Sequence, residues 1–260
     1  MNIVLIMSET NLWKPHFISQ IIKKLKPPDK ITGAVLITFK PANWSFKQYF
    51  NNYFSILGIK ASFLISLMLI KYKTLNLIDK FVGLSNSYNI ESVCRKNAIP
   101  VYFAKDINAP CTLDWIKSKN PDIIFNSGHQ IFKQELLSIP KVASINRHSS
   151  LLPSYRGVYP IFWSMLNDEK YVGVTFHTMD KEIDKGGIIA QDRIEIHNDD
   201  TFFSLFQKCY DLSVDLFLKS LEILRNGNWS PLQNNFAPSY FSFPTSNDAK
   251  LFRKKGKRII

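Results

Sequence analysis

The sequence predicts an α/β fold: a doubly wound, mostly parallel, Rossmann-like sheet. Residues 3–7 (Ile-Val-Leu-Ile-Met) form a continuous apolar run, which is typical of a strand buried on both faces. Strand-like and helix-like patterns then alternate along the chain, as they do in parallel βαβ units. With 260 residues, 45% of them hydrophobic, the chain is long enough to bury one such core.

The individual elements follow from apolar spacing and from proline and glycine breaks. The predicted strands are residues 3–7, 34–39, a short segment after Pro100, 122–126, a segment ending at Asn146, 171–177, and a segment after Gly187. The predicted helices are residues 16–25, 89–98, a segment from Leu113, a turn from Gln134, and an amphipathic helix from Thr201 that Gly227 closes. We expect a main domain over residues 1–200 and a C-terminal helix with a short helix/hairpin extension over residues 201–260.

A long aromatic and basic segment, about residues 43–81, interrupts the alternation and predicts a helical insertion. Ten uncharged residues lie between Lys60 and Lys71, fewer than the ~20 needed to span a bilayer. A buried helix is the first interpretation, and an amphipathic helix on an anionic membrane surface is the second. The proline-containing residues after Gly227 indicate an extended loop or hairpin with a basic end.

Composition restricts the compartment and the partners. The three cysteines are odd in number and contain no CxxC pair, which favours a reducing, cytoplasmic setting over disulfides or structural zinc. The N-terminus predicts a first strand rather than a signal peptide. The net charge of +12 suggests nucleic acid, anionic lipid or a phosphate-bearing substrate as a partner.

Polar clusters follow three predicted strands, at residues 126–129, 146–148 and 177–180, and Asp184 comes soon after. Ligands of open parallel sheets bind beyond the carboxyl ends of the strands. A histidine can move a proton, a carboxylate can orient that histidine, and an amide can stabilise an oxyanion. Because no GxSxG serine elbow is present, this set favours acyl transfer without a covalent enzyme adduct. A structural role for His129 and His177 stays open.

Two other kinds of site are less well supported by the sequence. The histidines lack the close spacing of zinc ligands, so no metal site is predicted. No GxGxxG motif follows the first strand, so a dinucleotide cofactor is not indicated.

Residues 122–191 resemble the folate-dependent formyltransferases, and are most similar to the nucleotide-sugar N-formyltransferases. The family pattern is Asn-x-His, then Ser-Leu-Leu-Pro-x-Tyr-Arg-Gly, then Gly-Val-Thr-x-His, then an Asp before a Gly that opens a strand. The sequence has these elements at residues 146–148, 150–157, 173–177 and 184. The resemblance implies that residues 1–200 are a formyltransferase catalytic domain and that 10-formyltetrahydrofolate is the formyl donor.

The resemblance also implies residue roles. Asn146 and His148 would stabilise the oxyanion that forms when an amine attacks the formyl carbon, and Asp184 would hold His148 or a water beside it. The implied cofactor-binding residues are Ser127, Gly128, His129, Ile131, Met179, Asp180 and Ile183. The implied substrate-binding residues are Tyr155, Arg156, Tyr159, Arg147 and His177. Packing of the loop is the alternative role for the tyrosines and arginines.

Chain length distinguishes the members of the family. The purine-pathway enzyme has no need of the insertion, and the tRNA enzyme carries a C-terminal β-barrel for which too few residues follow Gly227. We therefore expect formylation of a nucleotide-linked amino-dideoxy sugar, of the dTDP-4-amino-4,6-dideoxyhexose class, for O-antigen or lipopolysaccharide biosynthesis. The expected protein is a cytoplasmic homodimer that binds no nucleic acid. The alternatives are a methionyl-tRNA formyltransferase-like or other formyl-folate enzyme, such as a deformylase, and a non-catalytic membrane-bound partner protein.

Overall fold

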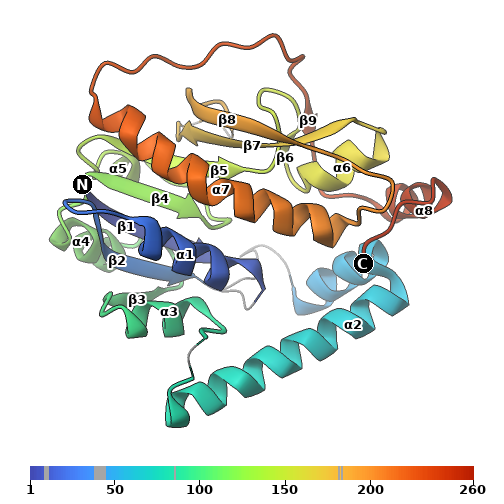
Figure 1. Cartoon of the computed structure of the whole chain (residues 1–260), viewed down its shortest axis with the longest axis horizontal. Helices are drawn as coiled ribbons and strands as arrows, with labels where there is room; N and C mark the ends of the chain where they lie inside the picture. The colour runs from blue at the N-terminus through green and yellow to red at the C-terminus, as the bar shows by residue number, and fades with distance from the viewer. Residues whose placement is uncertain (9–11, 38–44, 85, 181, 183) are drawn as a thin grey trace.

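A seven-stranded sheet forms the centre of the computed structural model, which describes the chain except for residues 9–11, 38–44, 85, 181 and 183 (Figure 1). The order of strands across the sheet is β3-β2-β1-β4-β5-β7-β8. Neighbours from β3 to β5 pair in parallel, whereas β7 is antiparallel to both β5 and β8. The strands are β1 (Asn2–Ser8), β2 (Lys30–Ile37), β3 (Val101–Ala104), β4 (Ile123–Ser127), β5 (Ala143–His148), β7 (Tyr171–Thr178) and β8 (Ile188–Glu195). The predicted fold class is confirmed.

Helices cover both faces of this sheet, which explains the continuous apolar run in β1. Ile3, Leu5 and Met7 point into one hydrophobic cluster, and Val4 and Ile6 point into the other. The first cluster includes side chains of α1 (Trp13–Lys24), α3 (Ile90–Lys96), α6 (Pro160–Leu166) and α7 (Phe202–Arg225). The second includes side chains of α4 (Pro110–Ser118) and α5 (Gln134–Leu137). Alternate residues of a strand face opposite sides, so a buried central strand needs apolar residues throughout.

The helix α7 belongs to the same core as the sheet. Its N-terminus is closed by a capping box between Thr201 and Ser204, and Phe217 and Leu221 are almost fully buried. Phe217 packs against Phe125 of β4, with ring centres 4.9 Å apart. A boundary at residue 200 stays a prediction, since α7 packs directly on the central strands.

The C-terminal segment differs from the predicted loop or hairpin. The short strand β9 (Tyr240–Phe241) pairs in parallel with β6 (Arg156–Gly157), and the chain ends in a helix, α8 (Ser246–Lys254). A capping box between Thr245 and Asp248 starts α8, and Phe252 stacks on Phe162 of α6 at 4.5 Å. Residues 228–239 contain no helix or strand, as expected of the extended loop, but no hairpin forms, because β9 pairs with a distant strand and one apolar face of α8 is buried.

The insertion forms a long helix, α2 (Phe46–Val82), that breaks at Gly58, where φ is 72° and ψ is 174°. Figure 1 shows it running along the lower edge of the molecule, outside the layers around the sheet. Within the described residues, one helical segment, Tyr53–Val82, is long and apolar enough to cross a membrane by length and composition; 11% of its apolar window is buried. The first interpretation of the insertion, a buried helix, was therefore wrong.

Candidate active site

Three neighbouring strands bring the predicted polar clusters to one edge of the sheet. Asn126 of β4 lies opposite Asn146 of β5, and Asn146 lies opposite His177 of β7. The chain after β7 then returns with Asp184 beside the same strand ends. The order β4-β5-β7 therefore assembles the site from segments that are far apart in the sequence.

The amide of Asn146 is held from both sides. Asn126 Nδ2 donates to Asn146 Oδ1 at 3.3 Å, and Asn146 Nδ2 lies 3.4 Å from His177 Nε2. His177 Nδ1 lies 2.8 Å from the carbonyl oxygen of Thr178, which can only accept, so Nδ1 carries the proton of the neutral ring. His177 Nε2 then accepts from Asn146. The second hydrogen on Asn146 Nδ2 is left to donate to a ligand oxygen.

His177 is the member of the site that stays uncharged. Its side chain is 2% exposed, and burial, opposed by Asp184 and assisted by His148, lowers the pKa of His177 to about 4. A neutral ring at this position keeps Nε2 available as an acceptor for the Asn146 amide. His177 therefore orients Asn146 and cannot itself carry a proton through a reaction at neutral pH.

One ring nitrogen of His148 bonds to a backbone carbonyl, and the other faces the Asp184 carboxylate. His148 Nε2 donates to the carbonyl oxygen of Tyr155 at 2.8 Å, which places the lone pair of the neutral ring on Nδ1. His148 Nδ1 lies 3.6 Å from Asp184 Oδ2, and both side chains are below 10% exposed. A proton that arrives on Nδ1 would form an ion pair with Asp184 in a largely dry site.

Asp184 is fixed between the two histidines by a strained turn. Its φ is 53°, and its Oδ2 accepts a hydrogen bond from the backbone N–H of Gly157 at 3.0 Å. Gly157 itself has a φ of 96°, and a Cβ there would lie 2.2 Å from the carbonyl oxygen of Phe241. The pairing of β6 with β9 thus requires glycine and aims its N–H at the carboxylate.

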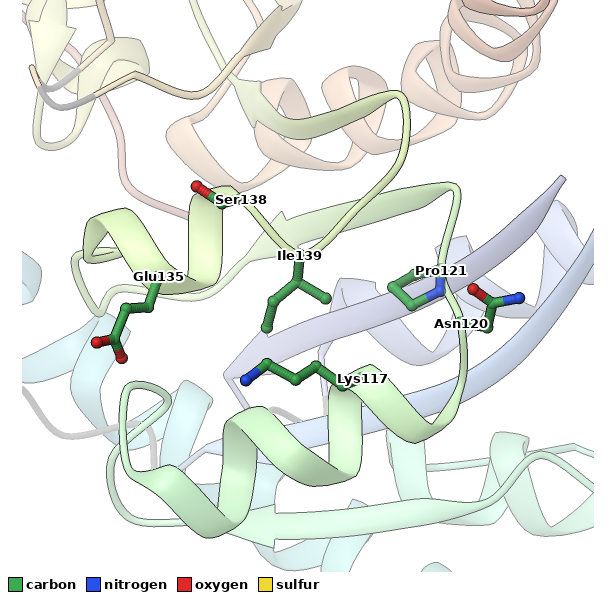
Figure 2. A pocket seen from close by; sticks show the side chains of 6 residues that line it. All are labelled: Lys117, Asn120, Pro121, Glu135, Ser138 and Ile139. Carbon is green, nitrogen blue, oxygen red and sulfur yellow. The ribbon is translucent and has the colours of Figure 1, made fainter.

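A cleft with a volume of about 170 Å³ opens beside Asp184. Its lining residues are Leu152, Pro153, Arg156, Asp184, Lys185, Gly186 and Ile188. A larger hollow of about 390 Å³, shown in Figure 2, is lined by Lys117, Asn120, Pro121, Glu135, Ser138 and Ile139. Asn120 and Pro121 precede β4, and Ser138 and Ile139 precede β5, so that hollow lies at the amino ends of the strands, away from the histidines.

The predicted cofactor residues lie on the loops that follow β4 and β7. Gly128 N–H donates to Asn126 Oδ1 at 2.9 Å, and Met179 N–H donates to the carbonyl oxygen of Ser144 at 2.8 Å. Ile131 is 67% exposed, whereas His129 Nδ1 lies 2.8 Å from Ser8 Oγ. Ile183 lies outside the described residues. Ser127 is the last residue of β4 and Asp180 lies on the loop after β7, and their roles in binding stay predictions.

The predicted substrate residues divide into two groups. Arg156 lines the cleft beside Asp184. The Tyr155 hydroxyl donates to Glu169 at 2.6 Å, and the Tyr155 ring stacks on Phe241. Tyr159 stacks on Phe202, 5.7 Å between ring centres. The contacts of both tyrosines therefore match the alternative role, packing of the loop.

The prediction that Arg147 binds substrate is corrected, because Arg147 lies on the opposite face of β5 from Asn146 and His148. Its Nε donates to Ser213 Oγ at 2.6 Å, and its guanidinium carbon lies 4.0 Å from the centre of the Tyr210 ring on α7. Side chains alternate along a strand, so a residue between two site residues points away from them. The predicted strand ends at Asn146, two residues before the end of β5 at His148, so the alternation of faces was not applied to Arg147.

Lys14, which the sequence did not single out, supports the strand ends beside the site. Its Nζ donates to the backbone carbonyls of Ser8, at 3.3 Å, and of Ser127, at the carboxyl ends of β1 and β4. Burial, and then the nearby Arg147 charge, lower the pKa of Lys14 to about 7. A signal was present, since Lys14 shares the helix face of Phe17, Ile18 and Ile21.

Comparison with known proteins decides the family. Residues 87–221 match the family model of the formyl transferases, described as Formyl transferase. The chain belongs to the formyl transferase family. Over 133 residues, which are 50% of this chain and 20% of the relative, it is 43% identical to the bifunctional polymyxin resistance protein ArnA of Wigglesworthia glossinidia brevipalpis. The chain thus spans about a fifth of the length of that curated relative.

Solved formyltransferases share the fold of this family member. A sugar N-formyltransferase from Shewanella sp. FDAARGOS_354 is 18% identical, with a TM-score of 0.59, over 97% of this chain and 87% of that one. Phosphoribosylglycinamide formyltransferase from Bacillus halodurans is 22% identical, with a TM-score of 0.56, over 85% and 93%. An N-formyltransferase from Helicobacter canadensis, in complex with folinic acid and dTDP-3-aminofucose, is 21% identical, with a TM-score of 0.58, over 100% and 83%. The predicted family is confirmed.

Proposed function

We propose that this formyltransferase moves the formyl group of 10-formyltetrahydrofolate to the amino group of a nucleotide-linked amino-dideoxy sugar. The observation that carries the proposal is the arrangement of Asn146, His148 and Asp184, with a free amide hydrogen and a basic ring nitrogen at one edge of the sheet. The structural neighbour from Helicobacter canadensis binds folinic acid, a formyl folate, which supports a donor of the same class here.

Each residue supplies one step of the transfer. The Asn146 Nδ2 hydrogen that His177 does not use donates to the formyl oxygen as negative charge develops there. As the amine nitrogen bonds to the formyl carbon, His148 Nδ1 accepts the proton that the amine loses. Asp184 stabilises the resulting imidazolium. His148 then returns that proton to the folate nitrogen as its bond to the formyl carbon breaks, so no net proton is taken up.

The loops that follow β4 and β7 fit a formyl folate. The exposed side chain of Ile131 offers an apolar surface to a pterin ring, and the backbone of residues 127–131 offers polar groups to its edge. These residues would hold the donor so that its formyl carbon reaches the Asn146 amide. Met179, Asp180 and Ile183 would complete this donor site.

The charge of the cleft favours a phosphate-bearing acceptor. Arg156 and Lys185 line it; Lys185 is paired with Glu182, whereas the planar guanidinium of Arg156 suits bidentate contact with a diphosphate. Both sugar N-formyltransferases and phosphoribosylglycinamide formyltransferases are among the structural neighbours. The sugar enzyme from Shewanella covers more of this chain than the Bacillus halodurans enzyme does, which favours a sugar acceptor, and the dTDP-4-amino-4,6-dideoxyhexose class is the one we propose. O-antigen or lipopolysaccharide biosynthesis, a cytoplasmic location and a homodimer remain part of this proposal.

An acceptor screen tests the proposal. The purified chain is incubated with 10-formyltetrahydrofolate and each of several amines: dTDP-, GDP- and UDP-linked amino sugars, glycinamide ribonucleotide and methionyl-tRNA. The expected product is one amino sugar that gains the mass of one formyl group, and it should form at least 100-fold more slowly when His148→Ala replaces the native chain. Formylation of glycinamide ribonucleotide or methionyl-tRNA alone would reject the sugar. Formylation of none of the amines would reject the proposed transfer.

A further inference from the structure

The second half of α2 exposes an apolar stripe. Ile59 and Phe63 begin it, and its members recur at steps of three, four or seven residues, which places them on one helix face. Their side chains are between 48% and 83% exposed. The members of this apolar stripe are Ile59, Phe63, Leu67, Ile70, Leu77 and Phe81. Exposed apolar surface of this extent marks an interaction site rather than ordinary surface.

Lysines border the apolar stripe on both sides. At 100° per residue, Lys60 and Lys71 fall on one flank of the stripe, and Lys73 and Lys80 fall on the other. All four are exposed. The only acidic residue between residues 46 and 82 is Asp79, and it turns inward. Asp79 is 0% exposed and bonds to Ser92, Arg95 and Lys96. The outer surface of this helix is therefore apolar and basic.

Both ends of α2 are tied to the same folded body. Near its start, Arg253 of α8 donates to the carbonyl oxygen of Ile56 at 3.1 Å, and Tyr53 packs against Phe243 with ring centres 5.6 Å apart. Near its end, Asp79 is paired with Lys96 at 2.8 Å. A helix held at both ends by one domain can lay its outer face along a surface, but it has no free end to pass through a bilayer.

We propose that the apolar stripe and its four flanking lysines dock this chain on the surface of an anionic lipid membrane. The stripe enters the boundary between headgroups and acyl chains, while the lysines extend to the lipid phosphates. A second copy of the chain is disfavoured, because facing stripes would bring like-charged lysines together. A membrane-spanning arrangement would bury Lys71 and Lys73 in hydrocarbon, and the helix is broken at Gly58 within the candidate span.

Vesicle co-sedimentation of the full chain tests this docking. The chain is mixed with vesicles of neutral phosphatidylcholine, or of phosphatidylcholine with phosphatidylglycerol, and the bound fraction is measured against lipid concentration. We expect binding to the anionic vesicles, weak binding to the neutral ones, and release at high salt. Failure of the native chain to sediment with the anionic vesicles would overturn the proposal.

Paired variants localise the effect. Phe63→Ser with Phe81→Ser removes two exposed rings of the stripe, and Phe103→Ser with Val142→Ser removes comparable apolar side chains elsewhere on the surface. A second variant, the stripe lysine variant, replaces the four flanking lysines, at residues 60, 71, 73 and 80, by glutamine. Its control replaces four other exposed lysines by glutamine, at residues 26, 30, 105 and 219. The stripe lysine variant should bind anionic vesicles on the order of 1000-fold more weakly than the native chain, and the control should bind normally.

Three results would refute the assignment. Equal loss of binding in the stripe lysine variant and its lysine control would mean that vesicle binding depends on net charge alone. Retention on vesicles after high salt and alkaline carbonate would indicate a spanning helix instead. Dimerisation in solution that Phe63→Ser with Phe81→Ser abolishes, without vesicle binding by the native chain, would assign the stripe to a second copy.

Discussion

His148 Nδ1 lies 3.6 Å from Asp184 Oδ2, and no proton of the neutral ring lies between them, because His148 Nε2 already donates to Tyr155. In the proposed transfer, this Nδ1 is the atom that accepts the proton of the amine. The proposed function treats the two residues as one unit, in which His148 is the base and Asp184 stabilises its charged form.

The first prediction concerns this unit. His148→Ala and Asp184→Asn should each lower kcat by about 10²- to 10⁴-fold, with little change in the KM of the acceptor, because each removes proton transfer rather than binding. The kcat of the double variant should be little lower than that of the less active single variant. Steady-state kinetics of the three variants provide the measurement, and fully additive losses would show that the residues act separately.

The second prediction concerns Asn146 and the residue that orients it. Asn146→Ala should lower kcat by about 10²- to 10³-fold, the effect of removing one oxyanion donor. Asn126→Ala leaves Asn146 in place but removes the donor to its Oδ1, so its loss should be clearly smaller. Equal losses would show that Asn126 does more than orient the neighbouring amide. Thermal unfolding of both variants controls for a loss of folded protein.

The third prediction concerns pH. The pKa of His177 is about 4 in the folded chain because of burial, below its ordinary value near 6.5. Between these values the unfolded chain binds a proton that the native chain does not, so the free energy of unfolding falls as the pH falls through this window. The full effect is about 3 kcal/mol below pH 4. Urea titrations from pH 7 to pH 4 measure it, and His177→Gln should flatten the dependence; an unchanged slope in that variant would contradict the assignment.

The fourth prediction concerns Gly157. Gly157→Ala places a Cβ 2.2 Å from the Phe241 carbonyl oxygen, so β9 must move away from β6, and the N–H that holds Asp184 moves as well. Activity should fall at least 10-fold and stability by a few kcal/mol. Gly227→Ala is the matched control: its φ of 72° is also positive, but nothing lies within 4 Å. It should cost only about 1 kcal/mol and leave kcat unchanged.

Much of the fold, and the candidate site residues Asn146, His148 and Asp184, could be predicted from local patterns. The predictions that failed share a cause. Apolar spacing specifies which face of a helix is apolar but not what covers it, so α2 could not be distinguished from a core helix. The helix α8 is mostly polar, and its stability comes from Phe252 packing on a residue distant in sequence. Asn146, Asn126 and His177 are brought together by strand order, which no local pattern contains.

The last prediction separates Arg147 from Arg156. Arg147 packs against Tyr210 and Ser213 behind the sheet, so Arg147→Met should lower the free energy of unfolding by about 1–3 kcal/mol and leave the KM of the acceptor within twofold. Arg156 lines the cleft, so Arg156→Ala should raise that KM at least 10-fold, with a change in stability within about 0.5 kcal/mol. Denaturant titration and initial-rate kinetics on both variants give the comparison. A raised KM for Arg147→Met with unchanged stability would return Arg147 to the substrate site and would place its side chain on the same face as His148.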